Sequence, residues 1–118
     1  MFTNKTINEQ HKVCKKYKVD YKTVAFNLMV GISDTLREGK MPINGERHLE
    51  EGGLTGWFIW AGEEFKESPD FFKPVHVSHI EKLYPAIVKY LALPPGWRFQ
   101  IDDRGYEDVW EDKSLLDI

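Results

Sequence analysis

Cysteine is nearly absent from this sequence, which has a single one, Cys14. One cysteine cannot form a disulfide within the chain, and it cannot build a zinc site from several thiolates. Long apolar runs are missing too, because no stretch approaches the ~20 apolar residues that a membrane-spanning helix needs. The first residues have no apolar run behind a basic start. We therefore expect no secretory signal and a cytoplasmic location.

Sequence motifs of common enzymes are also missing. The chain has no glycine-rich phosphate loop, no dinucleotide-binding fingerprint and no nucleophile elbow. The lysines near the N-terminus alternate with few aromatic residues, and the rest of the chain is acidic, which argues against nucleic-acid binding. A lone cysteine such as Cys14 is usually a small packing residue, although the neighbouring Lys15 and Lys16 would favour its thiolate.

Charge is distributed unevenly along the 118 residues, whose net charge is −3. Residues 1–24 hold six lysines against two acidic residues, whereas residues 102–118 hold seven acidic against two basic residues. An acidic C-terminal end repels nucleic acid and attracts a basic partner. A solvated surface without a partner would explain the same charge. Aromatic residues make up 14% of the chain, so a small core can bury much area.

The first thirty residues predict a surface helix followed by a strand. Residues 6–17 carry a thin apolar stripe at helical spacing, and Thr6 with Glu9 forms a capping box at its start. Residues 22–30 are rich in strand-forming residues and stop before Gly31, so we predict a strand there.

The next twenty residues predict little regular structure. Residues 33–38 predict one helical turn that Gly39 closes. Residues 41–48 contain a proline and the turn pair Asn44-Gly45. They predict an extended arm with a tight turn and no regular element.

A strand over residues 55–62 is the clearest feature of the middle of the chain. Its apolar run includes Trp57 and Trp60 and does not alternate with polar residues. Such a strand is covered on both faces, so we predict that it is central in its sheet and that both tryptophans are mostly buried. An exposed loop follows, and we expect Phe71 and Phe72 to pack that loop against the next helix.

The strongest helical signal lies between residues 80 and 91, where apolar side chains recur at helical spacing. Ser78 with Glu81 is interpreted as a capping box at its start. Pro85 removes a backbone donor inside this pattern. We expect either a kink there or a helix that begins at the proline.

The C-terminal part predicts a β-hairpin over residues 97–110, with its turn at residues 102–105, and then a short helical turn that docks Leu115 and Leu116. The fold class is therefore α+β: one domain over residues 1–118, with a mainly antiparallel twisted sheet of four or more strands and two main helices packed on it. The N-terminal helix belongs to residues 1–21. The sheet, the central helix and the hairpin belong to residues 22–118.

Two histidines and two glutamates support the hypothesis that the protein is a small enzyme. His76 and His79 stand three residues apart at a helix entry, and Glu63 and Glu64 follow the central strand. Together they would suit a small metal- or ligand-binding enzyme. The simpler interpretation is that the histidines satisfy polar groups at a strand-to-helix corner and that the glutamates keep the end of the sheet soluble.

Five segments, in order along the chain, together resemble one family. They begin at residues 42, 56, 68, 84 and 106 and read PINGERH, GWFIWAGEE, SPDFFKPVHVSHI, YPAIVKYLALPPGWRFQI and YEDVWEDKSLL. This pattern is similar to the bacterial immunity-protein-33 domain, formerly a domain of unknown function, of polymorphic toxin systems. The resemblance implies a non-enzymatic cytoplasmic binder that neutralises a cognate protein toxin. We expect no cofactor and no nucleic-acid or membrane partner. A scaffold module in a larger complex would be the plainer alternative.

An interface of this kind needs a few aromatic anchors surrounded by charge, and acidic charge speeds the encounter with a basic toxin. We therefore expect the partner to bind the C-terminal hairpin and the loop after the central strand. The candidate interface consists of Glu63, Glu64, Asp70, Asp103, Tyr106, Glu107, Asp108, Trp110 and Glu111.

Overall fold

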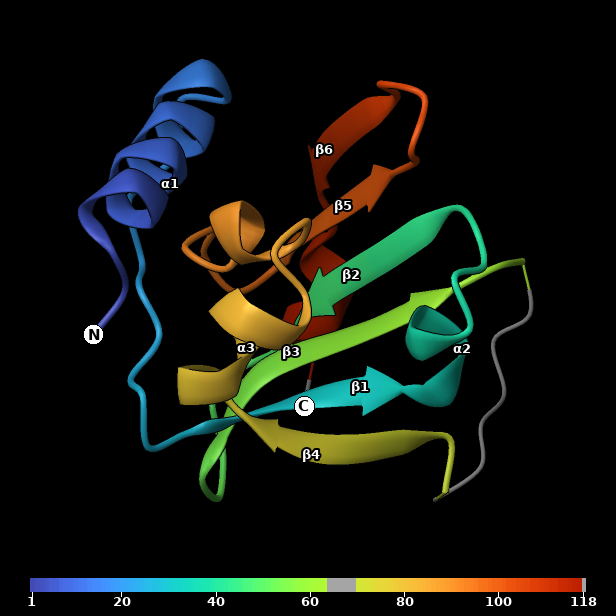
Figure 1. Cartoon of the computed structure of the whole chain (residues 1–118). Coiled ribbons are helices and arrows are strands. Elements are labelled where there is room, and N and C mark those ends of the chain that lie inside the picture. The colour runs from blue at the N-terminus through green and yellow to red at the C-terminus, as the bar shows by residue number, and fades with distance from the viewer. Residues whose placement is uncertain (64–69, 118) are drawn as a thin grey trace.

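A six-stranded mixed sheet forms the body of the protein. The computed structural model describes residues 1–63 and 70–117. Its strands are β1 (Met29–Ser33), β2 (Ile43–Arg47), β3 (Leu54–Ala61), β4 (Phe72–His76), β5 (Trp97–Ile101) and β6 (Glu107–Glu111). They lie in the order β4-β1-β3-β2-β5-β6 (Figure 1). Within the described ranges, β1 and β3 are parallel and the other neighbouring pairs are antiparallel.

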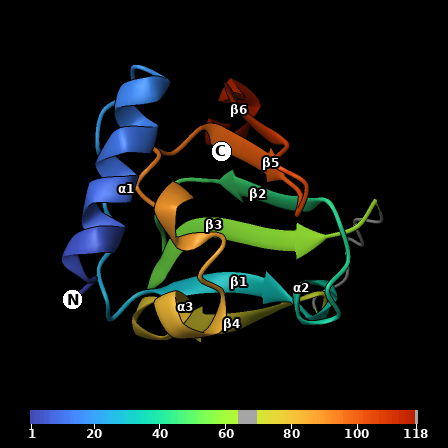
Figure 2. The ribbon, with the colours of Figure 1, turned by 45° about the horizontal axis from the view of Figure 1, so that its top comes forward.

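The α-helices lie on one face of the sheet, whereas the last turn of the chain lies behind it. They are α1 (Asn4–Lys16), α2 (Asp34–Arg37) and α3 (Val77–Leu83), with the 3₁₀ turns η1 (Val88–Tyr90) and η2 (Lys113–Leu116). Both α1 and α3 lie in front of the sheet, while α2 sits at the end of β1 (Figures 1 and 2). The α+β class and the mainly antiparallel sheet with helices on one face are confirmed. We call the sheet face opposite these helices the outer face.

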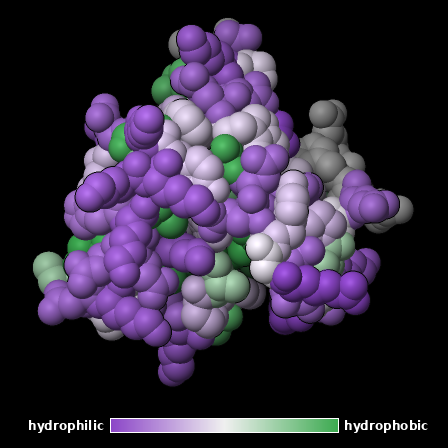
Figure 3. All heavy atoms as spheres, turned by 90° about the horizontal axis from the view of Figure 1, so that it is seen from above, coloured by the Kyte–Doolittle hydropathy of each residue, from purple (hydrophilic) through white to green (hydrophobic). Residues whose placement is uncertain are grey.

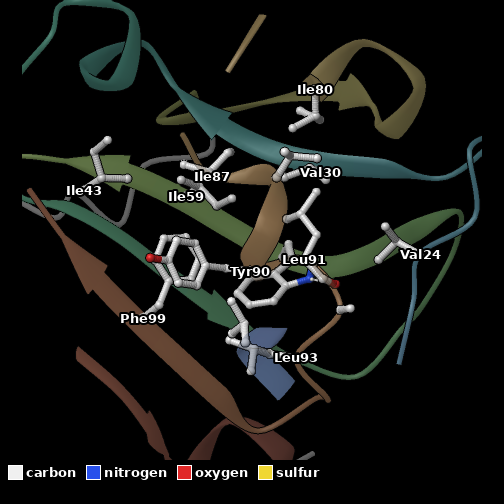
Figure 4. Close-up of a cluster of buried hydrophobic side chains, with 14 of the residues drawn as sticks. Val24, Val30, Ile43, Ile59, Ile80, Ile87, Tyr90, Leu91, Leu93 and Phe99 are labelled. Atoms are coloured by element: carbon white, nitrogen blue, oxygen red, sulfur yellow. Dashed lines mark hydrogen bonds between the residues drawn. The ribbon is translucent and has the colours of Figure 1, made fainter. Parts of the chain in front are cut away.

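The hydrophobic core lies between the sheet and this helical layer. Figure 4 shows Val30, Ile59 and Phe99 of the sheet meeting Ile87 and Leu91 of the segment after α3. All five side chains are at most 1% exposed. The segment between α3 and β5 therefore supplies part of the core.

The central strand β3 is buried on both faces, as its apolar run predicts. Trp57 points into the core, where its Nε1 donates to the Leu91 carbonyl at 3.0 Å. Trp60 belongs to the outer face and lies 6.1 Å from the ring of Phe72. Both tryptophans are buried, at 1% and 7% exposure. Because β3 has hydrogen-bonded neighbours on both sides, its predicted central position is confirmed.

The predicted extended arm at residues 41–48 is wrong, because Ile43–Arg47 forms β2, an internal strand between β3 and β5. The pair Asn44-Gly45 makes no turn there. Gly45 lies directly against the Phe99 ring, and a Cβ at this position would overlap that ring. This glycine therefore permits a close approach between two strands, a use that its sequence neighbours do not reveal.

Two predictions for the N-terminal part are displaced along the chain. α1 begins at Asn4, and Thr3 caps it by accepting a hydrogen bond from the Thr6 N–H at 3.2 Å, so Thr6 is not the cap. The strand predicted for residues 22–30 instead occupies Met29–Ser33. Lys22 donates its N–H to Ala92 at 2.7 Å, which ties the preceding segment to the helical layer and not to the sheet.

The helix predicted over residues 80–91 is broken before Pro85, so it is neither kinked at the proline nor started by it. α3 starts at Val77 without a side-chain cap, so the predicted box of Ser78 and Glu81 does not form. Instead, Glu81 accepts hydrogen bonds from the N–H and hydroxyl of Thr3 at 3.1 and 3.0 Å. The helix ends at Leu83, and after Pro85 only the turn η1 follows.

Three smaller predictions have clear outcomes. The helical turn after Ser33 forms as α2, with Ser33 as its cap. The hairpin and the final turn form as β5, β6 and η2, and Leu115 is buried at 8% exposure. Phe72, however, pairs with Ser33 as the first residue of β4 instead of belonging to a loop. Its ring packs against Phe58 at 5.2 Å on the outer face.

Candidate partner interface

The alternation of β6 divides the predicted interface between two faces of the hairpin. In the register of β5 and β6, Trp110 lies opposite Arg98 and Asp108 lies opposite Gln100. These side chains belong to the outer face. The intervening Val109 points into the core and is 7% exposed. The residues predicted on this strand therefore do not form one continuous surface.

Glu107 is an internal polar link between β6 and the helical layer. Its Oε1 accepts hydrogen bonds from Lys16 Nζ at 2.8 Å and from the Tyr17 hydroxyl at 2.6 Å, and its Oε2 accepts from the Tyr90 hydroxyl. Burial disfavours the charged carboxylate, but the hydrogen bonds from these three residues outweigh burial and lower the pKa of Glu107 to about 2. Burial and the bond to Glu107 raise the pKa of Tyr90. A partner therefore cannot use Glu107 as a free charge without breaking this cluster.

Arg98 organises a second cluster, which lies on the outer face. Its guanidinium pairs with Glu46 at 3.3 Å and with Asp112 at 3.0 Å. The same group lies 5.7 Å from the centre of the Trp110 ring, a cation–π distance. Trp110 is 36% exposed. Arg98 thus contacts one part of the Trp110 ring, while the rest of the ring faces solvent beside the exposed Asp108.

The hairpin turn presents two further predicted residues, Asp103 and Tyr106, both of them exposed. The side chain of Asp102 accepts hydrogen bonds from the N–H groups of Arg104 and Tyr106 at 2.8 and 2.9 Å. These bonds define the turn, and Gly105 supplies its positive φ of 93°. Tyr106 is 46% exposed, so the turn holds an aromatic side chain out in solvent.

Glu63 and Asp70 lie at the same end of the sheet as this turn. β3 and β5 both run antiparallel to β2, so both strands end there. Glu63 and Asp70 line a hollow of about 350 Å³ together with Asp34 and Glu38 of the α2 region. Glu64 lies outside the described residues. The structure therefore gathers Glu63, Asp70, Asp103 and Tyr106 at one end of the sheet, and Glu111 at the other end of β6.

His76 and Glu63, two residues of the metal hypothesis, lie toward opposite ends of the sheet. His76 pairs with Met29 at the start of β1. Glu63 follows β3 near the end of β1, where Ile32 pairs with Ile59. These two ends of β1 are roughly 13 Å apart at the usual rise of a strand. His76 and His79 lie near each other, with ring centroids 6.0 Å apart. No group of three or more possible metal ligands occurs within residues 1–63 and 70–117.

Sequence reasoning missed the buried Arg47, which is 2% exposed on the core side of β2. Its Nη1 donates to the carbonyls of Lys22 and Leu93, both at 2.7 Å, and its Nε donates to that of Thr55 at 3.3 Å. Burial lowers the pKa of Arg47 to about 10. Arg47 thus joins the sheet to the segments beneath the helices, which is a structural role. No local pattern in the sequence indicates it.

Two expectations from the sequence concern the reactivity of the Cys14 thiol and membrane-spanning helices. The Cys14 thiol is buried, and its burial raises its pKa, which is opposite to the activation that the neighbouring lysines would favour. Across the described part of the chain, no helix has the length and apolar character needed to cross a membrane.

Comparison with known proteins gives one match. A family model described as the Imm33-like domain matches residues 9–112. The matched range begins within α1 and ends just beyond β6, so it contains the whole sheet. The comparisons with curated proteins and with solved structures find no match.

Proposed function

The chain belongs to the Imm33-like domain family, and from that premise we propose that it is an immunity protein of a bacterial polymorphic toxin system. It binds a cognate protein toxin in the cytoplasm and neutralises it by protein–protein contact, without a cofactor and without catalysis. The observation that carries the proposal is the family match, which covers residues 9–112 and with them all strands of the sheet.

The surface we propose for toxin binding is the exposed part of the hairpin. Trp110 and Tyr106 supply exposed aromatic surface. Asp103 and Asp108 supply negative charge on the same hairpin. Partly exposed aromatic residues surrounded by charge are typical of interface hot spots. Acidic side chains speed association with a basic partner. Glu107 is left out of this surface because Lys16, Tyr17 and Tyr90 already occupy its carboxylate.

Co-expression with a candidate toxin domain taken from the genes adjacent to this one tests the function directly. Cells that make the toxin domain alone should stop growing, and cells that also make this protein should grow. The purified proteins should form a stoichiometric complex in size-exclusion chromatography. Loss of growth in both strains, together with the absence of a complex, would contradict the proposed function.

Charge reversal at Asp108 tests the surface. Asp108→Lys should weaken toxin binding about tenfold or more, because it places a like charge against a basic partner. The matched control is Glu51→Lys, which reverses an exposed acidic residue in the turn between β2 and β3, at the opposite end of the sheet from the hairpin turn. Equal affinities for the two variants would remove the hairpin from the interface and leave the function itself intact.

A further inference from the structure

The two edge strands of the sheet differ in whether they can accept another strand. β4 and β6 lie at opposite edges (Figures 1 and 2). Every second residue of an antiparallel edge strand directs its N–H and C=O groups away from the sheet. Such a row of groups is a template for a further strand unless the protein blocks it.

The β4 edge is blocked by a proline. Val77 donates its N–H to Leu28 at 2.9 Å, and in the register that continues this pair Val75 lies opposite Val30. Lys73, Val75 and Val77 therefore direct their backbone groups toward β1. Phe72, Pro74 and His76 direct their backbone groups away from β1. Pro74, the middle one, has no N–H for an added strand. An added strand would lose a hydrogen bond there and meet the proline ring.

The β6 edge is open. Asp112 donates its N–H to Gly96 at 2.6 Å, and Asp102 donates to Tyr106 at 3.2 Å. These bonds set the even-numbered residues of β6 toward β5. The residues whose backbone groups point away from β5 are therefore Glu107, Val109 and Glu111. Each of them has an N–H. The pairing with β5 is continuous over the five residues of β6, so no bulge twists this edge away. Within residues 1–63 and 70–117, β5 is the strand that pairs with β6.

The surface around this edge is polar. Seen from above, toward β6 and the end of α1, the molecule is mostly hydrophilic, with small separate hydrophobic areas (Figure 3). Asp108 and Glu111 are exposed on β6, whereas the carboxylate of Glu107 is already paired with Lys16. Lys12, Lys16 and Lys89 line a hollow together with Glu107. Within residues 1–63 and 70–117, Asp108 and Glu111 form no ion pair, so the unpaired charge of β6 itself is acidic. A second copy of β6 would bring the same acidic side chains against it, which is unfavourable for directly opposed strands.

We propose that the open edge of β6 is the docking site for an extended segment of the toxin, which adds to the sheet as a seventh strand. Its backbone pairs with Glu107, Val109 and Glu111. Its basic side chains lie on the outer face, beside Asp108 and Trp110. Main-chain hydrogen bonds supply affinity in this mode of recognition, and the alternate side chains supply specificity. This inference rests on the proposed function, because it assigns the mode by which the same toxin is bound.

Glu111→Pro is the direct test, because it places a proline on the free edge of β6, as Pro74 does on the edge of β4. The Glu111 N–H points outward, so the substitution removes no hydrogen bond to β5 and places a ring in the path of an added strand. Glu111→Gln is the matched control, because it removes the same charge and keeps the N–H. Thermal unfolding and the near-ultraviolet circular dichroism of both variants establish that the fold is retained.

The probe is the purified toxin domain that this protein neutralises in the co-expression test, with affinity measured by calorimetry. Glu111→Pro should weaken binding at least about tenfold, whereas Glu111→Gln should weaken it less than about threefold, in a salt-dependent manner. Amide hydrogen exchange measured on the wild-type complex tests the same contact without any substitution. Exchange at Glu107, Val109 and Glu111 should slow on binding.

Each contrary result has a distinct meaning. A tight complex in which these outward amides exchange as in the free protein, or in which both Glu111 variants bind alike, overturns the edge proposal and leaves the proposed function standing. The absence of any complex contradicts the function and the edge proposal with it. A dimer of this protein alone that Glu111→Pro dissociates would assign the edge to a second copy, which also overturns the proposal.

Discussion

The Tyr90 hydroxyl donates a hydrogen bond to Oε2 of Glu107, and so connects the turn η1 to the edge strand β6. Lys16 and Tyr17 at the end of α1 bind the other oxygen of the same carboxylate. One side chain thus joins three elements that are distant in sequence. The hairpin that carries the proposed interface owes its position to this link as well as to its pairing with β2.

Removal of the Glu107 carboxylate should therefore destabilise the whole protein. Glu107→Ala leaves the half-buried tyrosine hydroxyls without their acceptor, so the free energy of unfolding should fall by about 2–3 kcal/mol in urea denaturation. Asp108→Ala on the same strand is the control, and it should change the stability by less than about 0.5 kcal/mol. Equal effects of the two substitutions would show that the cluster contributes nothing to stability.

The same carboxylate predicts an acid dependence of stability. Hydrogen bonds hold the folded pKa of Glu107 at about 2, below its ordinary value of 4.5. A lowered folded pKa means that the stabilisation is complete above the unfolded pKa and is lost as the pH falls toward the folded pKa. The stability difference between wild type and Glu107→Gln should therefore shrink between about pH 4.5 and pH 2. A difference that stays constant across this range would contradict the assignment.

The close approach of Gly45 to Phe99 yields a third prediction. Gly45→Ala places a methyl group into the Phe99 ring, so we expect a loss of about 1–3 kcal/mol in thermal or urea unfolding. The double variant Gly45→Ala with Phe99→Leu tests the cause, because the smaller side chain makes room for the methyl group. The two substitutions together should then cost less than the sum of their separate effects. Strict additivity would mean that the ring is not the obstacle.

Several elements could be predicted because their signals are local. The non-alternating run of β3 indicates a strand covered on both faces, and the alternation of residues 97–101 separates the outer Arg98 from the buried Phe99. Gly105 and Asp102 define the hairpin turn within a few residues of each other. Pro85 ends a helix by its own geometry. Each of these signals comes from residues that contact one another within a turn or along one strand.

The site was predicted only in part, for the opposite reason. The acidic composition of the C-terminal end and the aromatic residues Tyr106 and Trp110 are visible in the sequence. That Glu107 faces the helical layer while Asp108 faces solvent depends on the register of β6 and on the position of α1. Likewise, Gly45 looks like a turn residue until Phe99 is placed against it. Partners such as these are brought together by strand pairing and not by sequence proximity.

The sequence by itself determined the class of fold, the central position of β3, the hairpin and the acidic character of its end. Tertiary structure alone decided that Ile43–Arg47 is an internal strand, that Glu107 is a link and not a contact residue, and that β6 is an open edge while β4 is closed. The physical reason is that local propensity and periodicity describe how a segment is shaped. Which strands become edges, and which charges find partners, depends on hydrogen bonds and packing between segments that lie far apart in the chain.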